Sequence, residues 1–170
     1  MESITTTSAT IYTDGSCHTR QRAGAWVAIL LIGGHKQILS GLVSDTTHNR
    51  MELTAVIKAL EYLRENYKDI TTLTICSDSQ YVIGLAARET RLSTLGFTTK
   101  KGKELPNADL VKELLDYFRL WTIEFVKIKA HRKKTESSNY NIEADWLARK
   151  LVRAAIIPDA AIIPDTTGLS

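Results

Sequence analysis

The sequence feature that most constrains the fold is an almost wholly apolar run, GAWVAILLI, at residues 24–32. A strand with one solvated face alternates apolar and polar residues, whereas a strand covered on both faces is apolar throughout. The run therefore predicts an inner strand that packs against other elements on both sides. The Gly33-Gly34 pair that follows is a hairpin turn signal, so residues 35–43 are predicted to return as an antiparallel strand.

Further strands and helices can be placed around this hairpin. Residues 10–13 form a short β-type run that leads to Asp14, and apolar residues recur at helical spacing from Asn49 until Asn66. The later elements are a strand at 73–76, a helix from Ser79, a helix at 110–121, a strand at 123–128 and a helix at 142–155 capped by Asn141, with polar segments at 88–108 and 131–141. The order β-β-β-α-β-α-α-β-α favours parallel pairing of the later strands in a mixed sheet covered by helices.

Composition narrows the class of protein. The chain has 170 residues, 44% apolar and 24% charged, which is typical of one soluble globular domain with a tail. Cys17 and Cys76 are far apart and not at a metal-ligand spacing, so neither a disulfide framework nor a zinc site is expected. The first residues, MESITTTSAT, lack the apolar core of a signal peptide, and no apolar run reaches membrane-spanning length. We expect a cytoplasmic monomer, whose net charge of +3 permits a polyanionic partner without requiring one.

Four acids stand at positions where a carboxylate could do chemistry. Asp14 and Asp78 each close an apolar strand, and if those strands are adjacent and parallel, both side chains emerge at the sheet edge where α/β proteins bind ligands. Glu52 lies at one margin of the apolar face of its helix, which is costly for a charge without a partner. Asp145 is predicted in the first turn of the last helix, where the helix dipole favours the ionised form. Taken singly, each acid also fits an ordinary role in a turn or at a helix end.

Four carboxylates brought together repel one another, so an active cluster would require cations. Hard ions such as Mg²⁺ or Mn²⁺ suit a site made only of oxygen ligands. Two such ions can activate a water and stabilise the leaving oxygen of a phosphodiester. Phosphodiester chemistry is therefore open to such a cluster, if the four acids converge.

Four motifs make this hypothesis specific. IYTDGSC, THNRMELTAVIKALEYL, ICSDSQYV and KAH…EADWLAR occur in this order, and together they resemble type 1 ribonuclease H over about residues 10–153. The resemblance implies the ribonuclease H-like fold of the α/β class, with a five-stranded mixed sheet in the order 3-2-1-4-5 flanked by α-helices. It also implies an endonuclease that hydrolyses the RNA strand of an RNA–DNA hybrid by a two-metal-ion mechanism, with 5′-phosphate and 3′-hydroxyl ends as products. Two Mg²⁺ ions per site are the expected cofactors, with Mn²⁺ as the substitute.

The resemblance assigns roles to individual residues. Asp14, Glu52, Asp78 and Asp145 match the catalytic, metal-binding carboxylates. His131, in KAH, matches the family's mobile-loop histidine, which is thought to assist proton movement or product release. Without that context a single histidine is more often structural or solvated.

Recognition of an RNA–DNA hybrid requires contact with the 2′-hydroxyl of RNA. By resemblance, Cys17, Asn49 and Gln80 lie along the minor groove near the RNA strand, although Cys17 could equally be a small buried thiol. Thr47 matches a phosphate-holding threonine on the DNA-strand side, and a helix-capping role would look the same in the sequence. Residues 88–104 carry five Lys or Arg and two Glu, and they coincide with a basic protrusion that grips the hybrid in many relatives. The cations expected to contact substrate there are Arg88, Lys100, Lys101 and Lys103.

The chain departs from the family pattern in two places. HTRQRAG replaces a loop that is often Gly/Pro-rich, and GFTTKKGKELPN resembles retroviral relatives more than cellular bacterial ones. Two alternatives keep the same fold: a hybrid-binding module that has lost catalysis, and a superfamily nuclease that acts on DNA. The presence of all four acids argues against the first, and the wording NRMEL and SDSQYV argues against the second.

The domain organisation follows from these boundaries. Residues 1–9 are predicted to be a flexible N-terminus, 10–153 the ribonuclease H domain and 154–170 a tail. The tail contains AAIIPD at 154–159 and again at 160–165, and its prolines prevent a long helix. It is either disordered or packed on the domain, and its isoleucine pairs could contact a partner or reflect only a local duplication.

Overall fold

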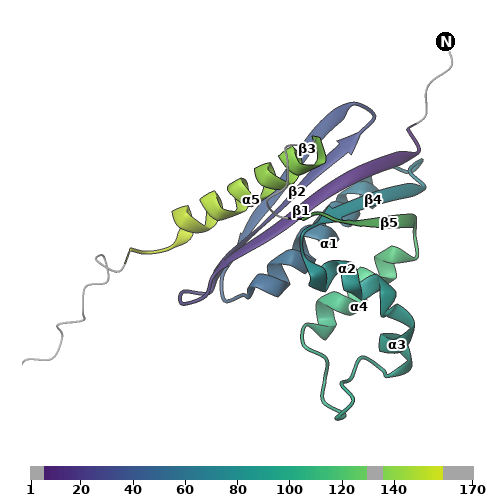
Figure 1. Cartoon of the computed structure of the whole chain (residues 1–170), viewed down its shortest axis with the longest axis vertical. Helices are drawn as coiled ribbons and strands as arrows, with labels where there is room; N and C mark the ends of the chain where they lie inside the picture. The colour runs from purple at the N-terminus through teal and green to yellow at the C-terminus, as the bar shows by residue number, and fades with distance from the viewer. Residues whose placement is uncertain (1–5, 130–135, 159–170) are drawn as a thin grey trace, which may run out of the picture.

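The computed structural model describes residues 6–129 and 136–158, and its strands form one five-stranded sheet in the order β3-β2-β1-β4-β5 (Figure 1). The elements are β1 (Ser8–His18), β2 (Ala23–Ile32), β3 (His35–Val43), α1 (His48–Asn66), β4 (Thr72–Ser77), α2 (Gln80–Ala87), α3 (Glu89–Thr94), α4 (Ala108–Phe118), β5 (Thr122–Lys127) and α5 (Glu136–Ala155). The predicted mixed sheet and its strand order are confirmed. Among the described residues, no helix combines the length and apolar character needed to cross a membrane.

The inner strand β2 is apolar because it faces helices on both sides. Its residues Ala28 and Leu30 belong to a core shared with α1, α2 and α4, whereas Val27 and Ile29 belong to a second core shared with α5. Successive side chains of a strand point to opposite faces, so a two-sided cover demands an unbroken apolar run. Figure 1 shows α5 on one face of the sheet and α1, α2 and α4 on the other.

Strand β1 pairs antiparallel with one neighbour and parallel with the other, and the site lies where the parallel pairing ends. β1 pairs antiparallel with β2 as far as His18, but its parallel pairing with β4 stops at Tyr12 and Cys76. Asp14 and Asp78 each follow two residues after that last parallel pair. The edge of β1 that faced β4 is therefore open beside both acids, as is usual at the carboxyl ends of parallel strands.

Gly15 allows helix α1 to lie unusually close to β1. A Cβ atom placed on Gly15 would lie 2.5 Å from the backbone nitrogen of Glu52 and 2.6 Å from the carbonyl carbon of Met51. Only a residue without a side chain fits such a contact. The Thr47 hydroxyl caps the start of α1 by accepting a hydrogen bond from the Arg50 backbone N–H at 3.3 Å. Together these contacts bring the first turns of α1 against the strand that carries Asp14.

Several predicted boundaries are wrong, and two of them affect the site. Asp14 is not at the end of β1, because the antiparallel partner β2 extends that strand to His18. The strand also begins at Ser8, two residues earlier than predicted, since Ala9 is buried and pairs with both β2 and β4. A third helix, α3, occupies part of the segment predicted to be only polar, because its Leu92 is buried in the core.

The last helix also begins earlier than predicted. α5 starts at Glu136, so Asn141 is a buried residue inside the helix and not its N-cap. Asp145 consequently lies well past the first turn, and the helix-dipole argument for its ionisation is wrong. The polar composition of this stretch is overridden by tertiary contacts: the Tyr140 ring packs 5.1 Å from Tyr12, and Lys36 reaches both Tyr140 and Glu143.

Candidate active site

Three of the predicted acids meet in one cluster. Asp14 on β1, Glu52 on α1 and Asp78 just after β4 offer carboxylate oxygens that all lie within 4.8 Å of one another. They line a cleft together with Asp145 of α5, so all four predicted carboxylates face the same space. The cluster is largely shielded from solvent, because Asp14 is 4% exposed and Glu52 is 2% exposed.

Burial and mutual repulsion disfavour the ionised form of these carboxylates when no cation is bound. Loss of hydration, followed by the charges of Glu52, Asp78 and Asp145, raises the pKa of Asp14 to about 9. Burial likewise raises the pKa of Glu52, although its hydrogen bond with His48 opposes the shift. Asp14 Oδ2 and Glu52 Oε2 are buried and accept no hydrogen bond from any described residue. Buried polar atoms are nearly always paired, so these two oxygens require a partner other than the described residues.

A divalent cation satisfies these requirements. The donor set consists of carboxylate oxygens, which are the ligands that Mg²⁺ and Mn²⁺ prefer. The two unpaired oxygens come from the same cluster, and a positive charge there would reverse the repulsion that raises the pKa of Asp14. Asp14, Glu52 and Asp78 therefore fit a metal ion.

Asp145 is held differently from the other three acids. Its Oδ1 accepts a hydrogen bond from Arg149 Nε at 2.7 Å, one turn further along α5. Arg149 also lines the cleft, so a fixed positive charge stands beside the cluster on the α5 side. Asp145 shares the cleft, but the structure pairs it with this arginine.

A histidine contacts Glu52 in the same way as Arg149 contacts Asp145. His48 is the first residue of α1, and its Nε2 lies 3.2 Å from Glu52 Oε1. The hydrogen bond to Glu52 is the main reason that the pKa of His48 is raised. The contact engages Oε1 and leaves Oε2 of the same carboxylate unpaired. The sequence analysis singled out neither His48 nor Arg149. Each stands four residues from a predicted acid in the same helix, and this spacing brings side chains together, so it could have revealed both contacts.

The predicted substrate contacts differ in position and in local role, and of Cys17, Thr47, Asn49 and Gln80 only Cys17 lines the cleft. Cys17 lines the cleft and is half-buried, with its Sγ 3.5 Å from the Thr46 carbonyl oxygen. Thr47 is the N-cap of α1, so the helix-capping reading of that residue is confirmed. Asn49 and Gln80 are exposed in the first turns of α1 and α2, next to Glu52 and Asp78 in sequence.

The predicted basic segment is built as a small folded loop. Thr98 and Glu104 form an antiparallel bridge, and Thr99 donates to the Lys103 carbonyl at 2.7 Å. Lys100, Lys101 and Lys103 are exposed around the tip of this loop. Arg88 lies at the α2–α3 junction, where its Nε donates to the Gly84 carbonyl at 3.1 Å. None of these four cations lines the carboxylate cleft, and His131 lies outside the described residues.

Comparison with known proteins places this site in a family. The model of the RNase H family matches residues 6–153. Ribonuclease H of Caldicellulosiruptor saccharolyticus is 34% identical over 84% of the chain and 94% of its own length, and that of Chlorobium luteolum is 38% identical over 85% and 94%.

Solved structures agree at the level of the fold. A type 1 RNase H with the type 2 active-site motif superimposes with a TM-score of 0.74 at 20% identity, covering 91% of this chain and 76% of that one. The foamy viral protease-reverse transcriptase in complex with an RNA/DNA hybrid matches with a TM-score of 0.64 at 23% identity, covering 88% of this chain and 20% of that one. With the family match over most of its length and curated relatives above 30% identity, the chain belongs to the ribonuclease H family.

Proposed function

We propose that the protein hydrolyses the RNA strand of RNA–DNA hybrids, using two divalent metal ions held by Asp14, Glu52, Asp78 and Asp145. The observation that carries this proposal is the buried cluster of three carboxylates within 4.8 Å of one another. Two of its oxygens have no hydrogen-bond partner among the described residues. The curated relatives that cover most of the chain are named ribonuclease H, which supports the same activity.

Some residues of the cleft would bind the metal ions, and others would hold those ligands in position. When bound, the metal ions would supply an activated water and charge stabilisation for the leaving oxygen, which departs as a 3′-hydroxyl and leaves a 5′-phosphate. Asp14 would be central, because the charges of Glu52, Asp78 and Asp145 all act on it. Arg149 would hold Asp145 in orientation, and His48 would do the same for Glu52. His131 is proposed to assist proton movement or product release, as the family motif implies.

Substrate binding is proposed to involve two groups of residues. Cys17 lines the cleft, and Asn49 and Gln80 are exposed in the first turns of α1 and α2, where they could contact the RNA strand and its 2′-hydroxyls. Thr47 could hold a phosphate of the DNA strand through its exposed position at the start of α1. Arg88, Lys100, Lys101 and Lys103 would add backbone contacts that carry affinity and not sequence preference. The choice of Mg²⁺ over Mn²⁺, the monomeric state and the cytoplasmic location stay predictions from the sequence.

The test is cleavage of an end-labelled RNA–DNA hybrid beside an RNA duplex and a DNA duplex of the same sequence. We expect cutting of the RNA strand of the hybrid alone, with Mg²⁺ or Mn²⁺ and not with a chelator. Asp78→Asn should remove at least about a thousandfold of the rate, which corresponds to about 4 kcal/mol of transition-state stabilisation. Equal cutting of all three duplexes would instead support a nuclease of broader substrate range. Binding of the hybrid without cleavage would support an inactive hybrid-binding module.

A further inference from the structure

The turn between β1 and β2 is hydrogen-bonded to the segment just after α5, far away in sequence. The Gln21 side chain accepts a hydrogen bond from the Ile157 backbone N–H at 2.9 Å and donates one to the Ile157 carbonyl at 2.6 Å. The two segments, residues 18–23 and 146–158, thus form one unit, here called the basic arm. Figure 1 shows the β1–β2 turn and the later half of α5 extending beyond the body of the domain on the same side.

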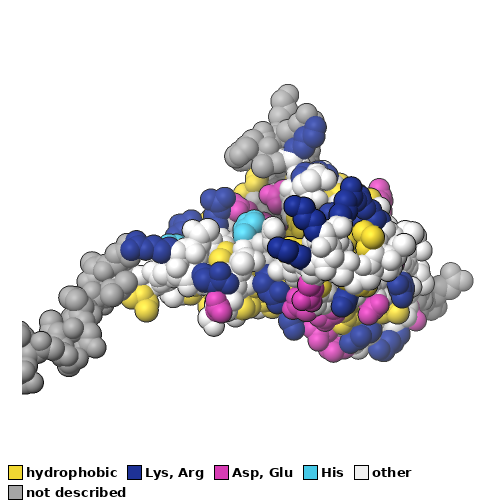
Figure 2. Space-filling model, turned by 90° about the horizontal axis from the view of Figure 1, so that it is seen from below, with side chains coloured by type: hydrophobic (Ala, Val, Ile, Leu, Met, Phe, Trp, Pro, Cys, Tyr) yellow, Lys and Arg dark blue, Asp and Glu magenta, His cyan; other side chains and the backbone are white. Residues whose placement is uncertain are grey.

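The basic arm is rich in positively charged side chains. Residues 18–23 and 146–158 contain Arg20, Arg22, Arg149, Lys150 and Arg153, and no Asp or Glu. Arg22 pairs with Asp45 and Arg149 with Asp145, both at 2.7 Å. Lys150 and Arg153 add two further positive charges at exposed positions of the same helix. In Figure 2, Lys and Arg side chains gather at the end of the molecule to which the later half of α5 extends.

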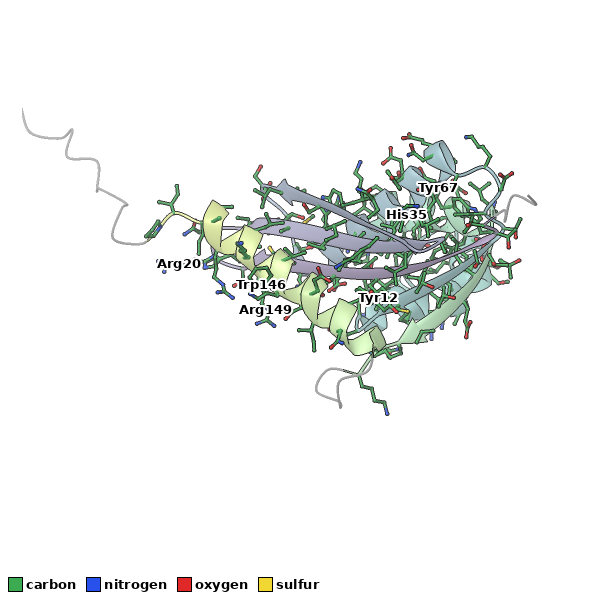
Figure 3. The ribbon with its side chains drawn as sticks, turned by 90° about the horizontal axis from the view of Figure 1, so that it is seen from above. Tyr12, Arg20, His35, Tyr67, Trp146 and Arg149 are labelled. Carbon is green, nitrogen blue, oxygen red and sulfur yellow. The ribbon has the colours of Figure 1, made fainter. Side chains whose placement is uncertain are left out.

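An exposed tryptophan lies on the same arm. Trp146 follows Asp145 directly and is 54% exposed, and the Lys150 ammonium lies 4.8 Å from the centroid of its ring. Figure 3 shows Trp146, Arg149 and Arg20 at the same end of the molecule. A solvated aromatic ring beside cations is a combination that nucleic-acid-binding surfaces use, because the ring packs against bases or sugars while the cations meet phosphates.

The basic arm is continuous with the catalytic cleft. Arg149 belongs to both, because it lines the cleft and bonds to Asp145. Arg153 follows Asp145 by eight residues, which is about 12 Å along the helix axis. At about 3.4 Å per base pair, this distance corresponds to three or four base pairs of a duplex. A nucleic acid lying in the cleft can therefore extend along the arm.

We propose that the basic arm is a second binding surface for the hybrid duplex, on the α5 side of the cleft, where Lys150 and Arg153 contact phosphates and Trp146 packs against the backbone. This surface is separate from the loop that carries Lys100, Lys101 and Lys103. The inference rests on the proposed function, since it extends the same substrate beyond the same site.

The experiment measures hybrid binding by the nuclease-deficient Asp78→Asn protein, with labelled hybrid and a series of salt concentrations. Lys150→Ala combined with Arg153→Ala should weaken binding several-fold at low salt. It should also flatten the plot of log K against log salt by about two, one for each lost phosphate contact. The matched control is Lys58→Ala combined with Lys68→Ala, which removes the same charge from exposed positions of α1 and the turn after it. The slope of that control should not change.

A second readout follows Trp146 itself. Of the three tryptophans, Trp26 and Trp121 are half-buried and Trp146 is the most exposed, so hybrid binding should quench intrinsic fluorescence through Trp146. Trp146→Phe should abolish the quenching while the protein still binds the hybrid. If these variants bind the hybrid normally, with unchanged salt slope and unchanged quenching, the proposal for the basic arm is wrong and the proposed function is unaffected. Failure of the Asp78→Asn protein to bind any hybrid would overturn the proposed function with it.

Discussion

Asp14 is the residue at which stability and function oppose each other. It is 4% exposed and lies among other acids, so the metal-free folded state favours its protonated form and its pKa rises to about 9 from the ordinary 3.8. A raised carboxyl pKa means that the folded protein holds a proton which the unfolded chain releases. Stability is therefore greatest below about pH 4 for this group and declines as the pH rises toward 9. Bound metal would cancel that decline, because it binds the ionised form.

The Asp14→Asn variant should be more stable than the wild type in the absence of metal. At pH 8 the amide removes the cost of holding a buried acid, and we expect a gain of about 1–3 kcal/mol. For a domain of this size, this corresponds to a rise in Tm of about 2–4 °C per kcal/mol, measured by calorimetry with a chelator present. Hybrid cleavage by the same variant should be lost. Asp69→Asn, which changes an exposed acid, should leave Tm unchanged; a lower Tm for Asp14→Asn would contradict the electrostatic account.

His48 should contribute to metal affinity through Glu52. Its Nε2 engages one oxygen of Glu52 at 3.2 Å, so the other oxygen keeps a fixed direction toward the cluster. Loss of such an outer partner typically weakens metal binding about tenfold or more. We therefore expect His48→Ala to lower Mn²⁺ affinity by about that factor in calorimetric titrations, and His48→Gln to recover part of it by supplying an amide donor. Equal affinities for wild type and His48→Ala would exclude this role, and His35→Ala at an exposed position of β3 is the control.

The close packing of helix α1 against strand β1 fixes the position of Glu52. Replacing Gly15 by Ala would place a Cβ 2.5 Å from the Glu52 backbone nitrogen, which is too close for a packed contact. The helix must move, and we expect a loss of about 1–3 kcal/mol of unfolding free energy together with a large loss of cleavage. The control is Gly84→Ala in α2, where the nearest atom is the end of the Arg88 side chain at 3.6 Å. That change should be neutral or stabilise by up to about 1 kcal/mol; comparable losses in both variants would contradict the close-approach argument.

The elements that local sequence determines were predicted well. β2, its glycine turn and β3 agree with the structure within a residue, because a long apolar run and Gly33-Gly34 with positive φ angles specify them locally. Helix α3 and the start of α5 were missed, because their stability comes from partners elsewhere in the chain: Leu92 in the core and Tyr140 on Tyr12. Propensity alone reads both stretches as polar loops.

For the complete domain, the sheet order followed from the family resemblance, and the structure confirms it. The resemblance also predicted four converging acids, of which Asp14, Glu52 and Asp78 lie within 4.8 Å of one another. Asp14 and Asp78 converge because β1 and β4 pair in parallel. The family motifs around the two acids predict this pairing, whereas the local sequence of each strand does not. The Asp145–Arg149 pair and the Gln21–Ile157 contact were not predicted. The first depends on which face of α5 meets the cleft, and the second joins segments that only the complete fold brings together.

The loop between α3 and α4 should affect binding and not chemistry. Lys100, Lys101 and Lys103 are exposed and do not line the carboxylate cleft, so replacing all three by Ala should raise KM at moderate salt and leave kcat nearly unchanged. The salt dependence of kcat/KM should flatten by about one unit for each lysine that meets a phosphate. Steady-state cleavage at several salt concentrations checks this, with Lys58→Ala combined with Lys68→Ala again as control. A fall in kcat with KM unchanged would argue against a purely binding role for the loop.

Anomalous X-ray scattering from crystals soaked in Mn²⁺ would show whether the carboxylate cluster holds the catalytic metal ions. We expect a peak among Asp14, Glu52 and Asp78, and, with a hybrid bound to a cleavage-deficient variant, a second peak about 4 Å away toward Asp145. Mn²⁺ peaks found only elsewhere on the protein, with none among these acids, would contradict the account.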